Sequence, residues 1–370
     1  MEDSNPSAFK HFINSNVIKK IASEIKSVHS SFDEKAFLKA TKDFEPLELK
    51  ARVLLVTKGL RAYLPQDYKK AVVILVDAIK RDKLSGFELW PFSEYFGQFG
   101  LDHFDESMKA MYEMTQRFTS EFAIRPFLLK NHIKVLKYFS KWAHDKNTHV
   151  RRWVSEGSRP ILPWGGKIPI FIMDPTHTLQ LLDQLKFDDE LYVRKSVANH
   201  LNDITKNHPA IVIKMLKLWQ EDCPAEYQDR LNWIKKQALR TLIKKGDKEA
   251  LKLMGVTGKA KVKMTPLKLN QKKYKLHDKL EFQFEIESTS TSKQTLVIDY
   301  LIDFMKANGK KGHKVFKLKT FEVKGREKVL IKKSHSLKPI TTMKYYSGLH
   351  HVLIQINGEI VGKADFDFKV

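Results

Sequence analysis

The chain has 370 residues, enough for about two domains, and a hydrophobic content of 42% that is sufficient to fill real cores. It contains no run of about 18 or more apolar residues, and its first residues, MEDSNPSAFKHF, lack the basic and apolar regions of a signal peptide. We therefore expect a cytoplasmic globular protein. Its single cysteine, Cys223, excludes internal disulfides and multi-cysteine metal clusters.

The charge is strongly positive. Lys and Arg number 66 against 43 Asp and Glu, which leaves a net charge of +23 and predicts a polyanionic partner. The segment after residue 255 is the more densely basic, with 24 basic and 11 acidic residues. Membrane phosphates attract such a surface too, but no strongly amphipathic, tryptophan-anchored helix accompanies the charge. Nucleic acid is therefore the expected partner.

Apolar residues recur at helical spacing from residue 8 to about 255, which predicts an all-α domain of short antiparallel helices over residues 1–255. Three segments within it can be aligned: VRRWVSEGS from Val150, VRKSVANHL from Val193 and IKKQALRTL from Ile234. Their spacings of 43 and 41 residues suit HEAT-like helical pairs. We therefore predict a HEAT-like α-solenoid.

The aligned helices share an apolar stripe and an opposite polar stripe. The apolar stripe consists of Val150, Val154, Val193, Val197, Ile234 and Ala238 and should pack against neighbouring helices. Stacked repeats line equivalent positions along one extended surface, so the basic polar stripe is expected to follow a phosphate backbone. Its candidate DNA contacts are Arg152, Arg159, Lys195, Asn199, Lys236 and Arg240. The alternative is that these stripes are merely solvated faces.

After about residue 261 the period becomes two, because Leu280, Phe282, Phe284 and Ile286 alternate with polar residues. Further strands are expected at 262–269, 295–304, 314–323, 327–333, 350–356 and 364–369. Seven short strands in this space predict an immunoglobulin-like β-sandwich over residues 256–370. The expected fold is mainly α with a smaller β domain.

Two carboxylates fall on the polar stripe. Glu156 shares a helix face with Arg152 and Arg159, and the simplest interpretation is a surface ion pair worth under about 1 kcal/mol. A carboxylate on a DNA-facing cationic stripe repels phosphates, however, and is best tolerated where it has a function. Asp203 falls on the same face one repeat later, although it can also end its helix. The repeat register predicts that the side chains of Glu156 and Asp203 share one face.

Two further residues are candidates with open alternatives. Glu121 has Arg117 and Arg125 four residues away on either side, which permits an intrahelical ion pair, and spacing alone does not bring it to the other carboxylates. Trp164 lies in a proline- and glycine-rich loop, where its ring either fills a gap between repeats or stacks on a base or a cation for about 0.5 to 2 kcal/mol. Trp153 is expected in the core.

No metal or cofactor is predicted. The histidines show no metal-ligand spacing, and no Gly-x-x-x-x-Gly-Lys-[Ser/Thr] phosphate loop occurs.

The run VRRWVSEGSRPILPWGGKIP resembles the signature of AlkC-type DNA alkylation-repair glycosylases. Three further segments, YVRKSVANHLNDITKNHP, GFELWPFSEYFGQFG and TQRFTSEFAIRPF, resemble other blocks of that family. The resemblance covers most of residues 8–255, and the C-terminal sandwich resembles an immunoglobulin-like domain that some of these proteins carry.

This resemblance implies excision of N3-methylated bases, chiefly 3-methyladenine and 3-methylcytosine, by cleavage of the N-glycosidic bond. It also implies a solenoid that holds kinked DNA without swinging the lesion into a deep pocket. Glu121, Glu156 and Asp203 correspond to the acidic positions around the lesion, and Trp164 to the aromatic one. Arg152, Arg159 and Asn199 are implied only as supports or phosphate contacts.

The partner implied is double-stranded DNA with alkylated bases, bound by a monomer in the cytoplasm, at the nucleoid of a bacterial cell. We also expect the basic sandwich to close over the DNA, with Lys310, Lys311 and Lys314 of the GKKGHK loop as contacts. The alternative is a non-enzymatic HEAT-repeat module that binds nucleic acid or protein.

Overall fold

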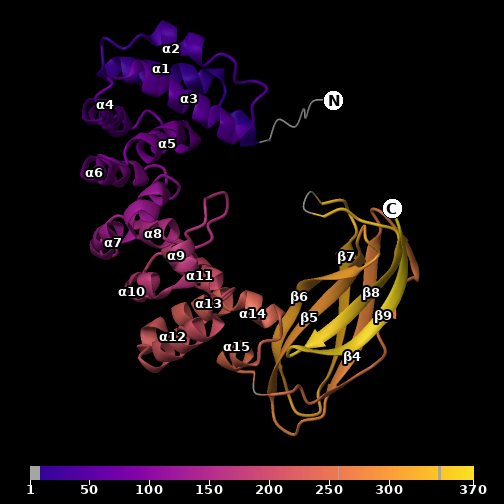
Figure 1. Ribbon diagram of the computed structural model, residues 1–370. Helices are drawn as coiled ribbons and strands as arrows, with labels where there is room; N and C mark the ends of the chain where they lie inside the picture. Colours follow the sequence, from indigo (N-terminus) through magenta and orange to yellow (C-terminus); the bar gives the residue numbers. More distant parts are fainter. Residues whose placement is uncertain (1–8, 257, 341–342) are drawn as a thin grey trace. The chain divides into compact units, whose positions relative to one another are not determined.

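The computed structural model describes residues 9–256, 258–340 and 343–370, which form two compact units (Figure 1). The first unit comprises the described residues up to His208 together with Ala225–Ile234. The second comprises Pro209–Pro224 and Lys235–Val370. The prediction of a mainly α fold with a smaller β domain is confirmed.

Short helices build the first unit, and successive helices stack on one another (Figure 1). Asparagine or aspartate side chains cap four of them by accepting a backbone N–H of the first turn, which satisfies donors that have no helical partner. The helices are α1 (Ser15–Val28), α2 (Glu34–Ala40), α3 (Leu49–Tyr63), α4 (Tyr68–Lys80), α5 (Trp90–Phe99), α6 (Phe104–Thr115), α7 (Ile124–Trp142), α8 (Thr148–Gly157), α9 (Pro169–Met173), α10 (Thr176–Leu185) and α11 (Leu191–Ile204). The 3-10 turns are η1 (Phe9–Phe12), η2 (Gly86–Leu89) and η3 (Ala225–Tyr227).

The predicted apolar stripe is confirmed. All of its side chains, on α8, α11 and α13 (Gln228–Ala238), are fully buried. Trp153 is also fully buried, with its ring 5.1 Å from that of Trp142 and 5.2 Å from that of Phe139, so its predicted core position is correct. Each valine or isoleucine of the stripe contributes about 1.5 to 3 kcal/mol by leaving water.

The second unit contains α12 (Pro209–Glu221), α14 (Arg240–Lys244), α15 (Lys248–Leu253) and two packed sheets. In the first sheet β4 (Lys279–Ser288) pairs with β1 (Val262–Met264), β2 (Lys268–Leu269) and β7 (Lys328–Ser336). The second sheet has the order β3-β9-β8-β5-β6, from β3 (Lys273–Lys275), β9 (Glu359–Lys369), β8 (Gly348–Ile356), β5 (Gln294–Met305) and β6 (Lys311–Val323). This is the predicted sandwich.

Three details differ from the strand pattern read in the sequence. The strand expected at 262–269 is interrupted, because Pro266 lies between β1 and β2 and has no N–H to donate to a ladder. The three-residue strand β3 was missed, since only Tyr274 of its residues is apolar and buried. The lysine-rich loop is also shorter than expected, because Lys311 already begins β6.

A small apolar cluster joins α15 to the second sheet. Leu251 and Val256 pack with Val297 of β5, and all three are buried. The predicted boundary at residue 255 stays a prediction, but cutting the chain there would expose this cluster. Removal of residues 256–370 would therefore also disturb the packing of α15, so its effect could not be assigned to the sandwich alone.

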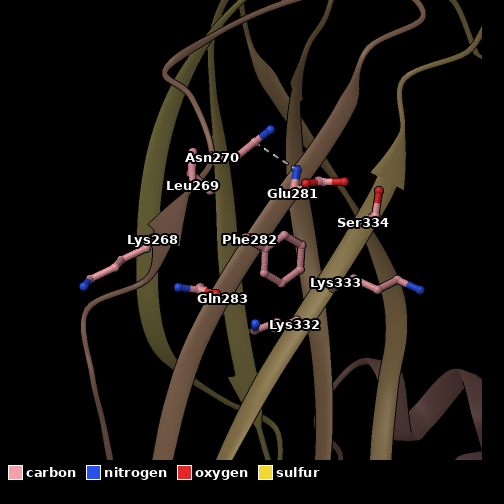
Figure 2. Close-up of a pocket in the computed structure, with 9 residues that line it drawn as sticks. All are labelled: Lys268, Leu269, Asn270, Glu281, Phe282, Gln283, Lys332, Lys333 and Ser334. Atoms are coloured by element: carbon pink, nitrogen blue, oxygen red, sulfur yellow. Dashed lines mark hydrogen bonds between the residues drawn. The ribbon is translucent and has the colours of Figure 1, made fainter.

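The four-stranded sheet carries a hollow of about 540 Å³ on β2, β4 and β7 (Figure 2). Gln283 of β4 lies in register between Lys268 and Lys332, and the backbone N–H of Glu281 donates to Asn270 at 3.2 Å. None of the residues predicted for the functional site lines this hollow.

Candidate functional site

Six charged side chains of alternating sign form a continuous series in the first unit. We call this series the charge chain. Its members are Glu121, Arg152, Glu156, Arg159, Asp203 and Lys206.

Arg159 joins the two carboxylates that the repeat register places together. Its Nη1 donates to Glu156 Oε1 at 2.7 Å and its Nε donates to Asp203 Oδ2 at 2.8 Å. Lys206 Nζ donates to the other oxygen of Asp203, Oδ1, at 2.9 Å. Glu156 on α8 and Asp203 in the last turn of α11 therefore lie on one face, as predicted.

Arg152 extends the series in the other direction. Its Nη2 lies 3.4 Å from Glu156 Oε1, one helical turn away, and its Nη1 donates to Glu121 Oε2. The guanidinium also lies over the ring of Tyr192, 5.1 Å from its centroid. The structure thus brings Glu121 to the other two carboxylates, which sequence spacing does not do.

The intrahelical ion pair considered for Glu121 is wrong. Glu121 lies in the turn between α6 and α7, so residues four positions away do not share a helical face with it. Arg117 pairs with Asp82 instead. The turn is held locally, because the Thr119 hydroxyl donates to Glu121 Oε2 at 2.8 Å and accepts from the Glu121 N–H at 3.2 Å.

The surface interpretation of the ion pairs is also wrong, because Glu156, Arg159 and Asp203 are buried. Burial lowers the pKa of Arg159, but Glu156 and Asp203 outweigh it and raise that pKa above its ordinary value. Arg152 behaves in the same way. Burial lowers its pKa, but Glu156 and Glu121 outweigh burial and raise that pKa above its ordinary value. Both guanidinium groups therefore stay charged.

The three carboxylates differ in how fully their oxygens are used. Glu156 Oε1 accepts from Arg159 and forms an ion pair with Arg152, and its Oε2 accepts from the Ser196 hydroxyl at 2.6 Å. Both contacts of Glu121 go to Oε2, and Oε1 has no partner among the described residues. Asp203 faces Lys206, whose side chain is 43% exposed. Both oxygens of Asp203 have partners, Arg159 and Lys206, and its side chain is the least exposed of the three. Of the three carboxylates, Glu121 thus has the oxygen that is open to a further partner.

Arg125, considered in the sequence only as a neighbour of Glu121, supports the loop that follows α8. Its guanidinium donates to the carbonyls of Gly157, Arg159 and Gly166 at 3.2, 2.9 and 2.5 Å. Burial, and then the charge of Arg159, lower the pKa of Arg125 to about 10. A Cβ on Gly165 would lie 3.2 Å from the Arg125 Cδ, which explains a glycine at this close approach.

Trp164 does not fill a gap between repeats, because it is 66% exposed. Its backbone is left-handed, with φ of 63°, a conformation that costs a bulky residue about 1 to 3 kcal/mol. Among the described residues its ring contacts the ring of Phe9, with centroids 6.0 Å apart. A strained backbone that presents a large ring to solvent is typical of a binding site.

The remaining predicted residues are distributed over both units. Lys195 is exposed on α11 and Asn199 is half-buried. In the second unit, Lys236 and Arg240 line a cavity of about 160 Å³, and Lys310 and Lys311 lie at the β5–β6 hairpin. For all of these, and for Arg152 and Arg159, contact with DNA stays a prediction.

His200 lies fully buried beneath the charge chain. Its Nδ1–H donates to the Ser155 carbonyl at 3.0 Å, and its Nε2 accepts from the Thr178 hydroxyl at 3.3 Å. Burial lowers its pKa to about 3, so the imidazole is neutral in the fold.

We expect stability to fall as the pH drops from about 6.5 toward 3, because there the unfolded chain binds a proton that the folded chain does not bind, with a slope of up to about 1.4 kcal/mol per pH unit. Urea unfolding of wild type and His200→Gln at pH 7 and pH 5 checks this. The variant should lose less stability between the two pH values than wild type does. Equal losses would show that His200 is not the titrating group.

No helix in the described part of the chain has both the length and the hydropathy to cross a bilayer. Within the described residues, no three His, Cys, Asp or Glu side chains are grouped as metal ligands.

Fold and site together define a HEAT-like repeat protein with an immunoglobulin-like domain and a buried series of carboxylates and arginines. Residues 263–370 match the family model described as the C-terminal Ig-like domain of the uncharacterised protein YhaZ. Protein YhaZ of Bacillus subtilis (strain 168) is 41% identical over 360 residues, covering 96% of this chain and 98% of the relative. The structure of Pseudomonas fluorescens alkylpurine DNA glycosylase AlkC, bound to DNA containing an abasic site analog, matches with a TM-score of 0.93 and 39% identity, over 98% of this chain and 100% of that one. The chain belongs to the AlkC family of DNA glycosylases.

Proposed function

We propose that this protein is a monofunctional DNA glycosylase that removes cationic N3-alkylated bases, 3-methyladenine and 3-methylcytosine, from double-stranded DNA. It acts as a monomer at the nucleoid and needs no cofactor. The observation that carries the proposal is the charge chain, which places three carboxylates among arginines in a chain similar over its full length to a DNA-bound glycosylase.

The substrate chemistry explains why carboxylates suit this site. Methylation at N3 gives the base a positive charge, so the bond to the sugar C1′ is weakened and no general acid is required. When that bond breaks, its electron pair goes to the base and the sugar becomes positive. Preorganised carboxylates stabilise this charge, and one of them can take the proton of the water whose oxygen bonds to C1′.

The geometry favours different roles for the three carboxylates. Glu121 has an oxygen without a partner in the described structure, so it is suited to contact the sugar or the water. Asp203 is buried and bound at both oxygens, so its part is to stabilise the developing positive charge electrostatically, beside the half-exposed Lys206. Glu156 lies between both arginines and also accepts from Ser196, so we assign it to positioning. This deepens the expectation from the sequence, which did not distinguish Glu156 from Asp203.

The small free volume beside Asp203 supports excision without a deep base pocket. The hollow beside Asp203, lined also by Pro160, Phe171 and His208, has essentially no free volume for a solvent molecule. A base swung into this hollow would not fit, which is consistent with a lesion that stays near the duplex.

The hairpin lysines Lys310 and Lys311 are proposed to bind DNA phosphates. Replacing both with glutamine should reduce the dependence of log Kd on log salt by about 0.9 for each phosphate that the variant no longer neutralises. Fluorescence anisotropy over a salt series measures this slope. Lys35→Gln on α2, also exposed, is the matched control and should leave the slope unchanged. A double variant with the wild-type slope would contradict this role.

Incubation of the protein with methylated DNA tests the proposed function. We expect free 3-methyladenine to be released above the heat-labile background, with abasic sites left in unbroken strands. A non-enzymatic DNA-binding module would bind the same DNA and release no base. That outcome would reject the proposed function.

A further inference from the structure

A row of aromatic side chains crosses the first unit next to the charge chain. We call it the ring strip. Its successive ring centroids are 6.0, 5.8, 4.6 and 5.9 Å apart, so the rings form an unbroken series of contacts. Its members in order are Trp164, Phe9, Phe12, Phe87 and Phe118.

Three of these rings face solvent. Trp164 is 66% exposed, Phe9 56% and Phe12 47%. Phe9 and Phe12 are the two ends of η1, and residues three apart in a 3-10 turn are eclipsed, so the turn presents both rings on the same side. Contiguous exposed aromatic surface is rare in a soluble chain and marks a place where something binds.

The end of the strip is shaped for a flat partner. The planes of Trp164 and Phe9 meet at 80°, with centroids 6.0 Å apart. A planar ring can stack on the face of one while its edge meets the other, and both arrangements are favourable for aromatic pairs. Aromatic faces of this kind bind nucleobases irrespective of sequence.

The ring strip and the charge chain are built on shared segments. Phe118 directly precedes Thr119, whose hydroxyl donates to Glu121. Trp164 lies in the loop whose backbone is held by Arg125, and the same guanidinium bonds the carbonyl of Arg159. Both ends of the strip are therefore linked by hydrogen bonds to members of the charge chain, Phe118 through Thr119 and Trp164 through Arg125.

We propose that the ring strip binds an unpaired nucleobase of the damaged DNA. The inference rests on the proposed function. Bases inside an intact duplex offer no free face, because each is covered above and below by its neighbours. A base that has lost its partner can leave the stack, and the Trp164–Phe9 corner covers its face again.

Two duplexes that differ by one base test this. Both carry an abasic-site analogue at one position, with thymine opposite in the first duplex and a second analogue opposite in the other. Wild type should bind the first about fivefold or more tightly, as expected for stacking one base on a ring. Phe9→Ala should bind both with nearly equal affinity.

Two further variants complete the test. Phe9→Tyr keeps the ring and should keep the preference. Leu129→Ala on α7 removes an apolar side chain of similar exposure outside the strip and should also keep it. Phe9 is exposed, so circular dichroism should show Phe9→Ala folded.

A wild type without the preference, or a Phe9→Ala variant that retains it in full, overturns the proposal. Base release by the same preparations separates this failure from failure of the proposed function. Release of 3-methyladenine without a preference for the unpaired base rejects only the ring strip, whereas a preference without release rejects the glycosylase activity.

Discussion

Replacing Glu156 with alanine is expected to lower the free energy of unfolding by about 3 to 5 kcal/mol, the range found when one partner of a buried ion pair is removed. Glu156 lies between two guanidinium groups, at 3.4 Å from Arg152 Nη2 and 2.7 Å from Arg159 Nη1. Without it, two like charges face each other in a largely buried site, and the Ser196 hydroxyl loses its acceptor. Ser196 adds to the loss because a buried donor without a partner is unfavourable.

Urea unfolding at neutral pH measures this effect. Glu113→Ala is the matched control, because Glu113 pairs with Arg117 at 3.8 Å, also one helical turn away, but both side chains are partly exposed. That change should cost under about 1 kcal/mol. If Glu156→Ala is no more destabilising than Glu113→Ala, the charge chain does not stabilise the fold.

Glu121→Gln and Asp203→Asn are each expected to slow base excision by about 100-fold or more, the usual loss when one preorganised group that stabilises transition-state charge is removed. Both substitutions keep the shape of the side chain and remove a negative charge. DNA binding should therefore be unchanged or tighter, since one fewer anion repels the phosphates. Single-turnover excision at saturating protein measures the rate of base excision independently of any change in DNA binding.

Asp188→Asn controls for loss of structure. Asp188 is a buried carboxylate paired with Arg151 at 2.6 Å, outside the charge chain. Its substitution should lower stability but leave single-turnover excision near the wild-type rate at temperatures where the variant is folded. A similar loss of excision in Asp188→Asn and Asp203→Asn would show that the loss reflects structure only.

The repeat register predicts part of this site from sequence. Helices with equivalent apolar stripes stack in register, so Glu156 and Asp203 had to lie on one face, and Arg159 joins them. Glu121 was beyond such reasoning, because it lies in a turn held by Thr119 and reaches the site through Arg152. The resemblance to AlkC-type proteins was the only sequence signal for it.

Contacts between distant segments account for what the sequence did not reveal. Phe9 meets Trp164 and Arg125 holds the loop after α8, and neither contact leaves a periodic pattern. In the sandwich, strict alternation identified β4, whereas β3 pairs with β9 through only three residues and leaves little signal.

The most direct test of the central claim is single-turnover release of 3-methyladenine from methylated DNA by wild type and by the double variant Glu121→Gln/Asp203→Asn. We predict release by wild type, and release by the double variant no faster than the heat-labile background, at equal DNA occupancy. If the double variant binds DNA normally and releases 3-methyladenine at the wild-type rate, the assignment of catalysis to the charge chain is contradicted.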